Sequence, residues 1–262
     1  MSRESYRDKA VVIRTYDFGE ADRVIVLLTR THGLVRGVAK GVRRAKSRFG
    51  SRLQQFVALD VQLYPGRGLD TITSADTVEY FGSGIIDNYE AYTAACAVLE
   101  TAQRLVHTDA EPDPYYFDAV THAFRRLQRA ADLSPASESS ANPAPSHQAV
   151  HPIVDAFSLQ AFAHAGWAPS LFNCASCGAT GPHRAFHPAV GGAACVKCRP
   201  PGAAEVDPET LHLMWLYLGD YMDAARNLIS NRPELVSEAH RLTIAHIQWH
   251  LERKVTALNL RD

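Results

Sequence analysis

The sequence lacks several features that would point to a membrane protein or a nucleotide-dependent enzyme. No apolar run approaches the roughly 20 residues that a membrane helix needs. There is no G-x-x-x-x-G-K-[ST] phosphate loop, and Gly66-Arg67-Gly68 is too short for a dinucleotide fingerprint, so ATP hydrolysis and NAD chemistry are unsupported. The start, Met1 to Lys9, is charged and polar, unlike an export signal. We therefore expect a cytoplasmic protein without a membrane partner.

Motifs of metal-dependent catalysis are also missing. His246 and His250 have the i, i+4 spacing of a zinc helix, but residue 247 is Ile and the Glu of H-E-x-x-H is absent. His250-Leu251-Glu252 matches the H-x-E of zinc deaminases, yet it follows the cysteine pairs, the reverse of the order in that signature. We interpret both histidines as partly buried helix residues, and we expect no enzymatic activity.

Acidic residues are absent between Asp22 and Asp60. The net charge of -1 is therefore the sum of an uneven charge distribution along the chain. Residues 1–80 contain 14 Lys/Arg and 9 Asp/Glu, whereas the remainder contains 13 and 19. Seven positive charges lie within residues 36–52, the basic segment. Without acidic partners nearby, these charges repel one another unless they face water or phosphate, so we predict a surface that follows a nucleic-acid backbone. A solvated, flexible charged loop is the alternative.

Residues 10–81 show a β-like pattern, with short β-branched and aromatic runs separated by Gly and charged turns. Five strands are predicted, at 10–18, 23–29, 34–39, 53–64 and 69–81. Five strands in so short a stretch favour a small closed barrel of the oligonucleotide-binding (OB) kind, because closure removes exposed sheet edges. An SH3-like barrel fits nearly as well. The basic segment falls between two strands of this barrel. The residues predicted to contact DNA are its seven cations, Arg36, Lys40, Arg43, Arg44, Lys46, Arg48 and Arg52, together with Arg67 and, as a stacking ring, Phe49.

The rest of the chain has helical periodicity, so the predicted fold class is α+β, with an OB barrel at 1–82 and a mostly helical domain at 83–262. Asn88, Asp113-Pro114 and Asp207-Pro208 are predicted helix starts, and Gly166 a helix end. One helix is expected from Pro208 to about Ile229, and a last one at 233–258. Ser, Pro and Ala fill 11 of the 15 positions of 134–148, which predicts a disordered loop.

Four cysteines form the most specific pattern in the chain. Cys174 and Cys177 make one C-x-x-C pair, Cys195 and Cys198 another, and 17 residues separate the pairs, as in a zinc site. Two such turns supply the four thiolates of a tetrahedral Zn²⁺ site, and four cysteine ligands leave no open position, so the predicted ion is structural. The zinc finger is placed at 171–201. Two disulfides, or a vestigial site that binds no metal, are the alternatives.

Several runs together resemble the N-terminal domain of the bacterial recombination mediator family RecO. They are Gly19-Glu20-Ala21-Asp22-Arg23, Leu27-Leu28-Thr29, His32-Gly33-Leu34, Ala39 to Arg44, Ser47-Arg48-Phe49-Gly50 and Leu69 to Thr73. The four cysteines in a largely helical C-terminal part extend the resemblance to nearly the whole chain. Two features depart from the family: Gln55 stands where Pro is common, and the 134–148 stretch looks lineage-specific.

The resemblance implies a non-enzymatic DNA-repair function. The family binds single- and double-stranded DNA, anneals complementary strands, and works with RecR to help RecA displace single-strand-binding protein, whose tail would bind the helical domain. Nucleoid association in the cytoplasm is the implied location. Two other readings stay open: a zinc-ribbon transcription or adaptor protein whose OB- or SH3-like barrel binds protein, and a metal-dependent hydrolase or deaminase acting on nucleic acid.

Overall fold

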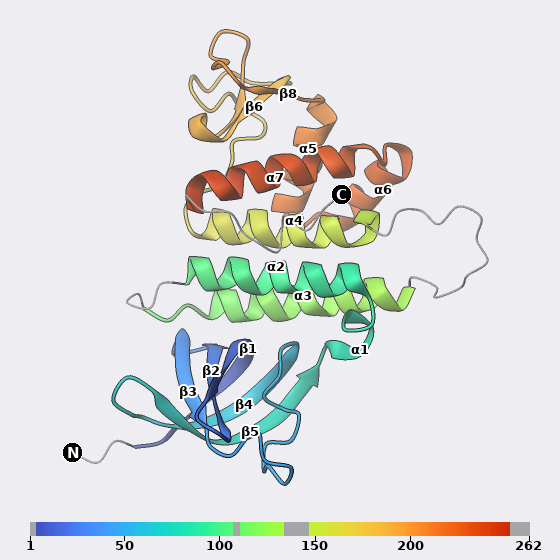
Figure 1. Cartoon of the computed structure of the whole chain (residues 1–262). Helices are drawn as coiled ribbons and strands as arrows, with labels where there is room; N and C mark the ends of the chain where they lie inside the picture. The colour runs from blue at the N-terminus through green and yellow to red at the C-terminus, as the bar shows by residue number, and fades with distance from the viewer. Residues whose placement is uncertain (1–3, 107–110, 134–146, 252–262) are drawn as a thin grey trace. The chain divides into compact units, whose positions relative to one another are not determined.

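The computed structural model describes residues 4–106, 111–133 and 147–251 (Figure 1). The chain divides into two compact units. The first comprises Met1–Ala95 and Ala102–Asp132, and the second comprises Cys96–Thr101 and Leu133–Asp262. None of the helices in the described ranges combines the length and apolarity required to cross a membrane. The predicted boundary after residue 82 falls where strands give way to helices, and as a domain boundary it stays a prediction.

Five strands close into a barrel in the first unit, drawn in blue to blue-green in Figure 1. They are β1 (Tyr6–Phe18), β2 (Asp22–Thr29), β3 (Leu34–Ala39), β4 (Val57–Tyr64) and β5 (Asp70–Tyr80). Around the barrel the order is β1-β2-β3-β5-β4, and β1 pairs with β4 to complete the ring. Only β3 and β5 are parallel, and their pairing covers two positions, Gly37 with Asp70 and Val38 with Thr71. This is the five-stranded barrel that the sequence predicts, with the strand order of an OB fold.

Alternate residues of the strands fill the barrel, as the two-residue period of a strand requires. Two further apolar side chains, Phe49 and Leu53, enter from the connection between β3 and β4. The buried interior consists of Ala10, Val12, Ile25, Leu27, Ala39, Phe49, Leu53, Val57, Leu59, Val61, Leu63, Ile72 and Ala75. The barrel therefore has a continuous apolar core of its own.

Three helices follow: α1 (Gly82–Ile85), α2 (Tyr89–Leu105) and α3 (Pro114–Leu133). The Asn88 side chain accepts hydrogen bonds from two backbone N–H groups of α2, and Asp113 accepts one from Tyr115 at the start of α3, which confirms both predicted caps. The barrel contacts α3 through two ion pairs, Arg30–Asp118 at 3.0 Å and Glu79–Arg125. These contacts lie at the barrel end where β2 and β5 finish.

The second unit contains α4 (His147–His164), α5 (Pro208–Leu218), α6 (Met222–Asn231) and α7 (Leu235–Leu251). A small sheet in the order β7-β6-β8 lies between α4 and α5 in the chain, from β6 (Ala185–His187), β7 (Gly192–Ala194) and β8 (Ala204–Glu205), with the 3-10 turn η1 (Pro188–Val190). Asp207 caps α5 as predicted, its side chain accepting from Glu209 N. The shared core includes Leu159 of α4, Phe186 of β6 and Tyr217 of α5.

Two helix predictions need revision. The single helix expected from Pro208 to about Ile229 is wrong, because the chain turns at Gly219 and Asp220, where Asp220 adopts a φ of +60°, and α6 begins only at Met222. The predicted loop 134–148 falls outside the described residues over 134–146, and its last two residues already belong to α4. The last helix, predicted for 233–258, is described from Leu235 to Leu251, and the positions beyond lie outside the described residues.

Candidate nucleic-acid interface and metal centre

The basic segment begins on β3 and continues after Ala39 as a series of turns. It leaves β3 at Lys40, and Gly41 takes a φ of +67° that favours glycine. The N–H of Gly41 donates to Asp22 Oδ1 at 2.7 Å, which ties the start of the segment to β2. Successive turns follow, with Arg44 N donating to Gly41 O and Ser47 N to Arg44 O. The stretch therefore has a defined backbone path, while Arg43, Arg44 and Lys46 are exposed to solvent.

Two arginines of the segment bind the barrel itself. Arg48 donates to the carbonyl of Ile72 at 3.4 Å, and Arg52 donates to the carbonyl of Ala75 at 3.1 Å. Both carbonyls belong to β5, beyond the point where its pairing with β3 ends. The two guanidinium groups thus satisfy backbone acceptors along a free strand edge. Their predicted DNA contact stays a prediction, and any such contact would have to share these groups with the fold.

Arg43 has an acidic partner that the local sequence did not reveal. Its guanidinium lies 3.5 Å from Asp17 Oδ2, and Asp17 also pairs with Arg23 at 3.0 Å. The expectation that the segment lacks acidic partners is wrong at this one position. The other basic residues predicted to contact DNA are exposed and form no ion pair with any carboxylate in the described ranges: Arg36, Lys40, Arg44, Lys46 and Arg67. These five side chains therefore carry positive charge that no carboxylate among the described residues pairs with.

Phe49 does not offer a ring to a ligand. Its side chain is 1% exposed and packs in the barrel core, with the Arg48 guanidinium 4.8 Å from the ring centroid. The prediction that Phe49 stacks on a base is wrong, because an apolar ring at the end of a closed barrel is stabilised by entering it. The exposed aromatic rings of the barrel are instead Tyr16, Phe18, Tyr64 and Tyr80.

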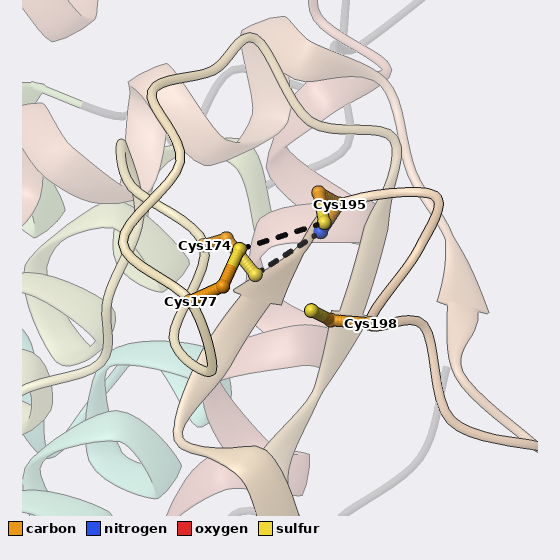
Figure 2. Close-up of side chains that lie close together, drawn as sticks. All are labelled: Cys174, Cys177, Cys195 and Cys198. Carbon is orange, nitrogen blue, oxygen red and sulfur yellow. Dashed lines mark hydrogen bonds between the residues drawn. The ribbon is translucent and has the colours of Figure 1, made fainter.

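The four predicted metal ligands come together. All four Sγ atoms of Cys174, Cys177, Cys195 and Cys198 lie within 4.8 Å of one another, and Figure 2 shows them converging from two separate turns. The Sγ atoms of Cys177 and Cys195 are 3.8 Å apart. Ligands about 2.3 Å from a tetrahedral zinc ion would be about 3.8 Å apart, whereas a disulfide is about 2.05 Å long. The donor set and its spacing therefore fit a four-coordinate structural metal, and none of the five cysteines, all within the described ranges, forms a disulfide.

Local turns aim the thiols at this point. Gly178 N donates to Cys174 O with Gly178 at a φ of +73°, and Cys198 N and Arg199 N both donate to Cys195 O. The N–H of Cys195, with that of Cys177, lowers the pKa of Cys174 to about 6, which favours the thiolate. Hydrogen bonding with the Cys177 and Cys195 thiols raises the pKa of Cys198 to about 12. A divalent cation would replace that proton and hold all four sulfurs as thiolates.

The scaffold under the cysteines is small. Phe186 of β6 and Ala193 of β7 are buried and join the core of the second unit. Gly192 allows the two halves of the finger to meet, because a Cβ at this position would lie 2.2 Å from Ser170 O. The two C-x-x-C turns themselves lie at the surface, where Cys177 and Val196 are exposed. The buried apolar side chains of the finger are few and mostly small: Leu171, Ala185, Phe186, Ala193, Ala194 and Val206.

The two helix histidines stand apart from the metal centre. His246 is 1% exposed, packs near Phe162 and Phe186, and shares a 2.9 Å hydrogen bond with the carbonyl of Trp167. Burial lowers the pKa of His246 to about 4, so the ring is neutral near pH 7. His250 stacks on the Trp167 ring with centroids 5.5 Å apart. The interpretation of His246 as a buried helix residue is confirmed, and burial is nearly complete.

An apolar pocket of about 510 Å³ opens in the second unit, where the finger meets α5. Phe172 and Trp215 are 63% and 43% exposed beside it, although large aromatic side chains are usually buried. Its apolar lining comprises Leu171, Phe172, Pro182, Pro208, Leu211 and Trp215, and two histidines, His183 and His212, complete the wall. Sequence reasoning missed this pocket, since its residues come from two segments joined only by the fold.

Comparison with known protein families gives two matches, one in each unit. The family described as "Recombination protein O N terminal" matches residues 1–81, which contain the barrel and the basic segment. The family described as "Recombination protein O C terminal" matches residues 145–259, which contain the four cysteines. The two matches occur in the order expected of a single protein and together span most of the chain.

Proposed function

The chain belongs to the RecO family of recombination mediators in DNA repair, and on that premise we propose that it binds single- and double-stranded DNA and anneals complementary strands. The observation that carries this proposal is the set of exposed cations on and beside the basic segment that have no acidic partner in the part of the chain that the structure describes. Lys40, Arg44 and Lys46 lie close together in sequence on ordered turns. Such a surface can follow a phosphate backbone without reading bases.

Annealing needs no bond chemistry, and we propose none for this protein. Two complementary strands repel through their phosphates, and a protein that neutralises phosphates on both lowers this repulsion while base pairs form. The roles of the nine predicted DNA-contacting residues divide on structural grounds. Arg36, Lys40, Arg44, Lys46 and Arg67 are the main phosphate contacts, Arg43, Arg48 and Arg52 have intramolecular partners, and Phe49 belongs to the core.

The proposed partners follow from the family. RecR would act together with this protein, and RecA would benefit indirectly as single-strand-binding protein is displaced. The tail of single-strand-binding protein is proposed to bind the second unit. The apolar pocket beside Phe172 and Trp215 supports this placement, since its exposed aromatic lining suits a short apolar segment.

We propose that the metal is Zn²⁺ and that its role is structural. Four thiolates form a closed tetrahedral set with no position for water or substrate. The ion would stabilise the finger and keep Cys177 and Cys198, which are not buried, from other thiol chemistry.

A zinc-ribbon adaptor whose barrel binds protein is the second candidate. The apolar pocket favours a protein partner for the second unit, but no feature of the barrel favours one over nucleic acid. Annealing activity separates the two candidates, because a mediator should pair complementary strands, whereas an adaptor whose barrel is occupied by a protein partner should not.

The decisive experiment measures the salt dependence of oligonucleotide binding for Lys40→Ala/Arg44→Ala/Lys46→Ala. Each lost contact should reduce the slope of log K against log salt by about 0.7, so the triple variant should lose about 2. A matched control, Lys9→Ala/Arg226→Ala/Arg241→Ala, removes three exposed charges outside the segment and should keep the slope. Fluorescence annealing of complementary oligonucleotides should slow in the first variant only. Equal slopes for both variants would remove the basic segment from the mechanism.

A further inference from the structure

A β-bulge at Ile13 changes which side chains of β1 face outward. Val12 lies opposite Leu27 and Arg14 lies opposite Val26, so Ile13 is an extra residue in the ladder. Simple alternation from the interior residue Val12 would direct Arg14, Tyr16 and Phe18 into the core. The bulge moves them by one position to the outer face of the barrel. All three side chains are exposed.

The outer face of β1, β2 and β3 consequently contains lateral rows of side chains, and in the row nearest the β1–β2 turn Phe18 lies opposite Asp22. In one row Arg14 lies opposite Val26, which lies opposite Arg36. In the next row Tyr16 lies opposite Val24, which lies opposite Val38. An aromatic and aliphatic row therefore lies directly beside a row with an arginine at each edge.

The two rings are unusually open for aromatic side chains. Tyr16 is 42% exposed and Phe18 is 49% exposed, two positions apart on the same strand. Residues i and i+2 of a strand lie on the same face about 7 Å apart, roughly the spacing of successive bases in an extended single strand. The Arg14 guanidinium lies 3.5 Å from the Tyr16 hydroxyl, which places a cation at the edge of the ring.

Charge on this face favours a polyanion. Arg14, Arg36 and Lys40 are exposed. Arg36 and Lys40 form no ion pair with any carboxylate in the described ranges. The nearby acids are largely engaged: Asp17 pairs with Arg23 and Arg43, and Asp22 accepts from Gly41 N. Glu20 is exposed at the β1–β2 turn. The face is continuous with the start of the basic segment, since β3 leads into Lys40.

We propose that Tyr16 and Phe18 form a base-stacking platform that gives the barrel its preference for unpaired strands over duplex, an inference that rests on the proposed DNA binding. Bases of a duplex stack on one another inside the helix, so their faces are closed to protein rings. Bases of a single strand are free to stack on aromatic side chains, and every base has a suitable face. Arg14 and Arg36 hold phosphates on one side of the stacked bases. The basic segment binds either form of DNA, and the platform distinguishes between them.

The test compares Tyr16→Ala/Phe18→Ala with the wild-type protein on three probes of equal length: a single strand, a duplex, and an abasic single strand. Stacking contributes about 5- to 150-fold in affinity per base, so the double variant should bind the single strand at least about 30-fold more weakly. Duplex affinity and the salt slope should stay unchanged, because no charge is removed. The wild-type protein should disfavour the abasic strand, and the variant should not distinguish the two strands.

Two controls make the outcome unambiguous. Tyr89→Ala removes a ring of α2 that is 72% exposed, and it should leave all three affinities unchanged. Tyr16→Phe/Phe18→Tyr keeps two rings and should retain single-strand affinity. Wild-type binding with equal affinity for normal and abasic strands would overturn the platform while leaving the proposed DNA binding intact. Absence of salt-dependent binding to any probe would overturn the proposed function instead.

Discussion

The barrel and the finger reach order by different physical means. The barrel buries a continuous apolar interior in which Leu27, Leu59 and Leu63 have no measurable exposure. The finger has few apolar anchors, and its turns converge on four sulfur atoms within 4.8 Å of one another. Burial of apolar surface is non-directional and distributed over many residues, whereas a metal centre concentrates stability in four bonds. This difference predicts that loss of metal unfolds the finger and leaves the barrel folded, and that loss of core packing destabilises the barrel and leaves the finger folded.

The largest effect is expected from removing two metal ligands with Cys174→Ser/Cys195→Ser. Metal binding supplies on the order of 10 kcal/mol to small zinc domains, so the finger should lose its order. Hydrogen exchange should accelerate across 171–206, while β1 to β5 keep their protection, and bound zinc measured by mass spectrometry should disappear. Cys96→Ser, which changes a cysteine outside the cluster, is the control. Protection that persists in the finger without metal would show that the two regions are not as different as proposed.

A smaller effect is expected from Phe49→Ala in the barrel. Truncating a fully buried Phe typically costs about 3–5 kcal/mol, through lost apolar burial and the cavity that remains. Urea denaturation should show this loss for the barrel, and the zinc content should not change. Tyr64→Ala removes a barrel ring that is 47% exposed and should cost much less. Equal losses for the two variants would contradict the placement of Phe49 in the core.

The smallest effect concerns His246, which packs against Phe186 beneath the finger. Its pKa in the folded protein, about 4, lies below the unfolded value of 6.5, so folding favours the neutral ring. The contribution of the neutral His246 ring to the free energy of unfolding is fully present above about pH 6.5. It is lost as the pH falls toward 4, and the loss is at most about 3 kcal/mol. His246→Gln, which can still donate to Trp167 O, should flatten this dependence.

Acid also protonates metal-binding thiolates, so the quantity to compare is the difference between the wild-type and His246→Gln unfolding curves at each pH. A difference that grows as the pH falls from 6.5 to 4 supports the burial of a neutral ring. A constant difference would mean that His246 titrates normally in the folded protein.

Local signals in the sequence predicted much of the fold. The β3 bounds were predicted to the residue, and the capping roles of Asn88, Asp113 and Asp207 follow from short-range hydrogen bonding that any chain segment can make. The cysteine spacing likewise predicted the cluster, because two C-x-x-C turns can place four sulfurs with little help from the rest of the protein.

The features that sequence reasoning missed depend on tertiary context. The bulge at Ile13 leaves no mark in composition, yet it reverses the orientation of Tyr16 and Phe18. Phe49 looked like an exposed ring because its neighbours are basic, and only the barrel interior explains its burial. Arg43 pairs with Asp17, which is 26 positions away in the chain, because the turn after β3 brings Arg43 beside the β1–β2 turn, where Arg43 N donates to Ala21 O.

The helical part shows the same limit. Tyr89 and Tyr92 are 72% and 40% exposed at the start of α2, although large aromatic side chains are usually buried. The break between α5 and α6 depends on Asp220 adopting a left-handed conformation, which periodicity cannot reveal.

The parallel seam between β3 and β5 has a consequence for how the barrel moves. Every other wall of the ring is joined over six or more residue positions, whereas this one is joined over two. Separating strands costs most where the ladder is longest, so thermal breathing of the ring should concentrate at Gly37 and Val38. Such a movement would pivot at the end of β3, where the chain passes into the turns of the basic segment. A DNA strand bound to the basic segment would therefore stabilise the short β3–β5 pairing. The barrel should be less mobile when DNA is bound.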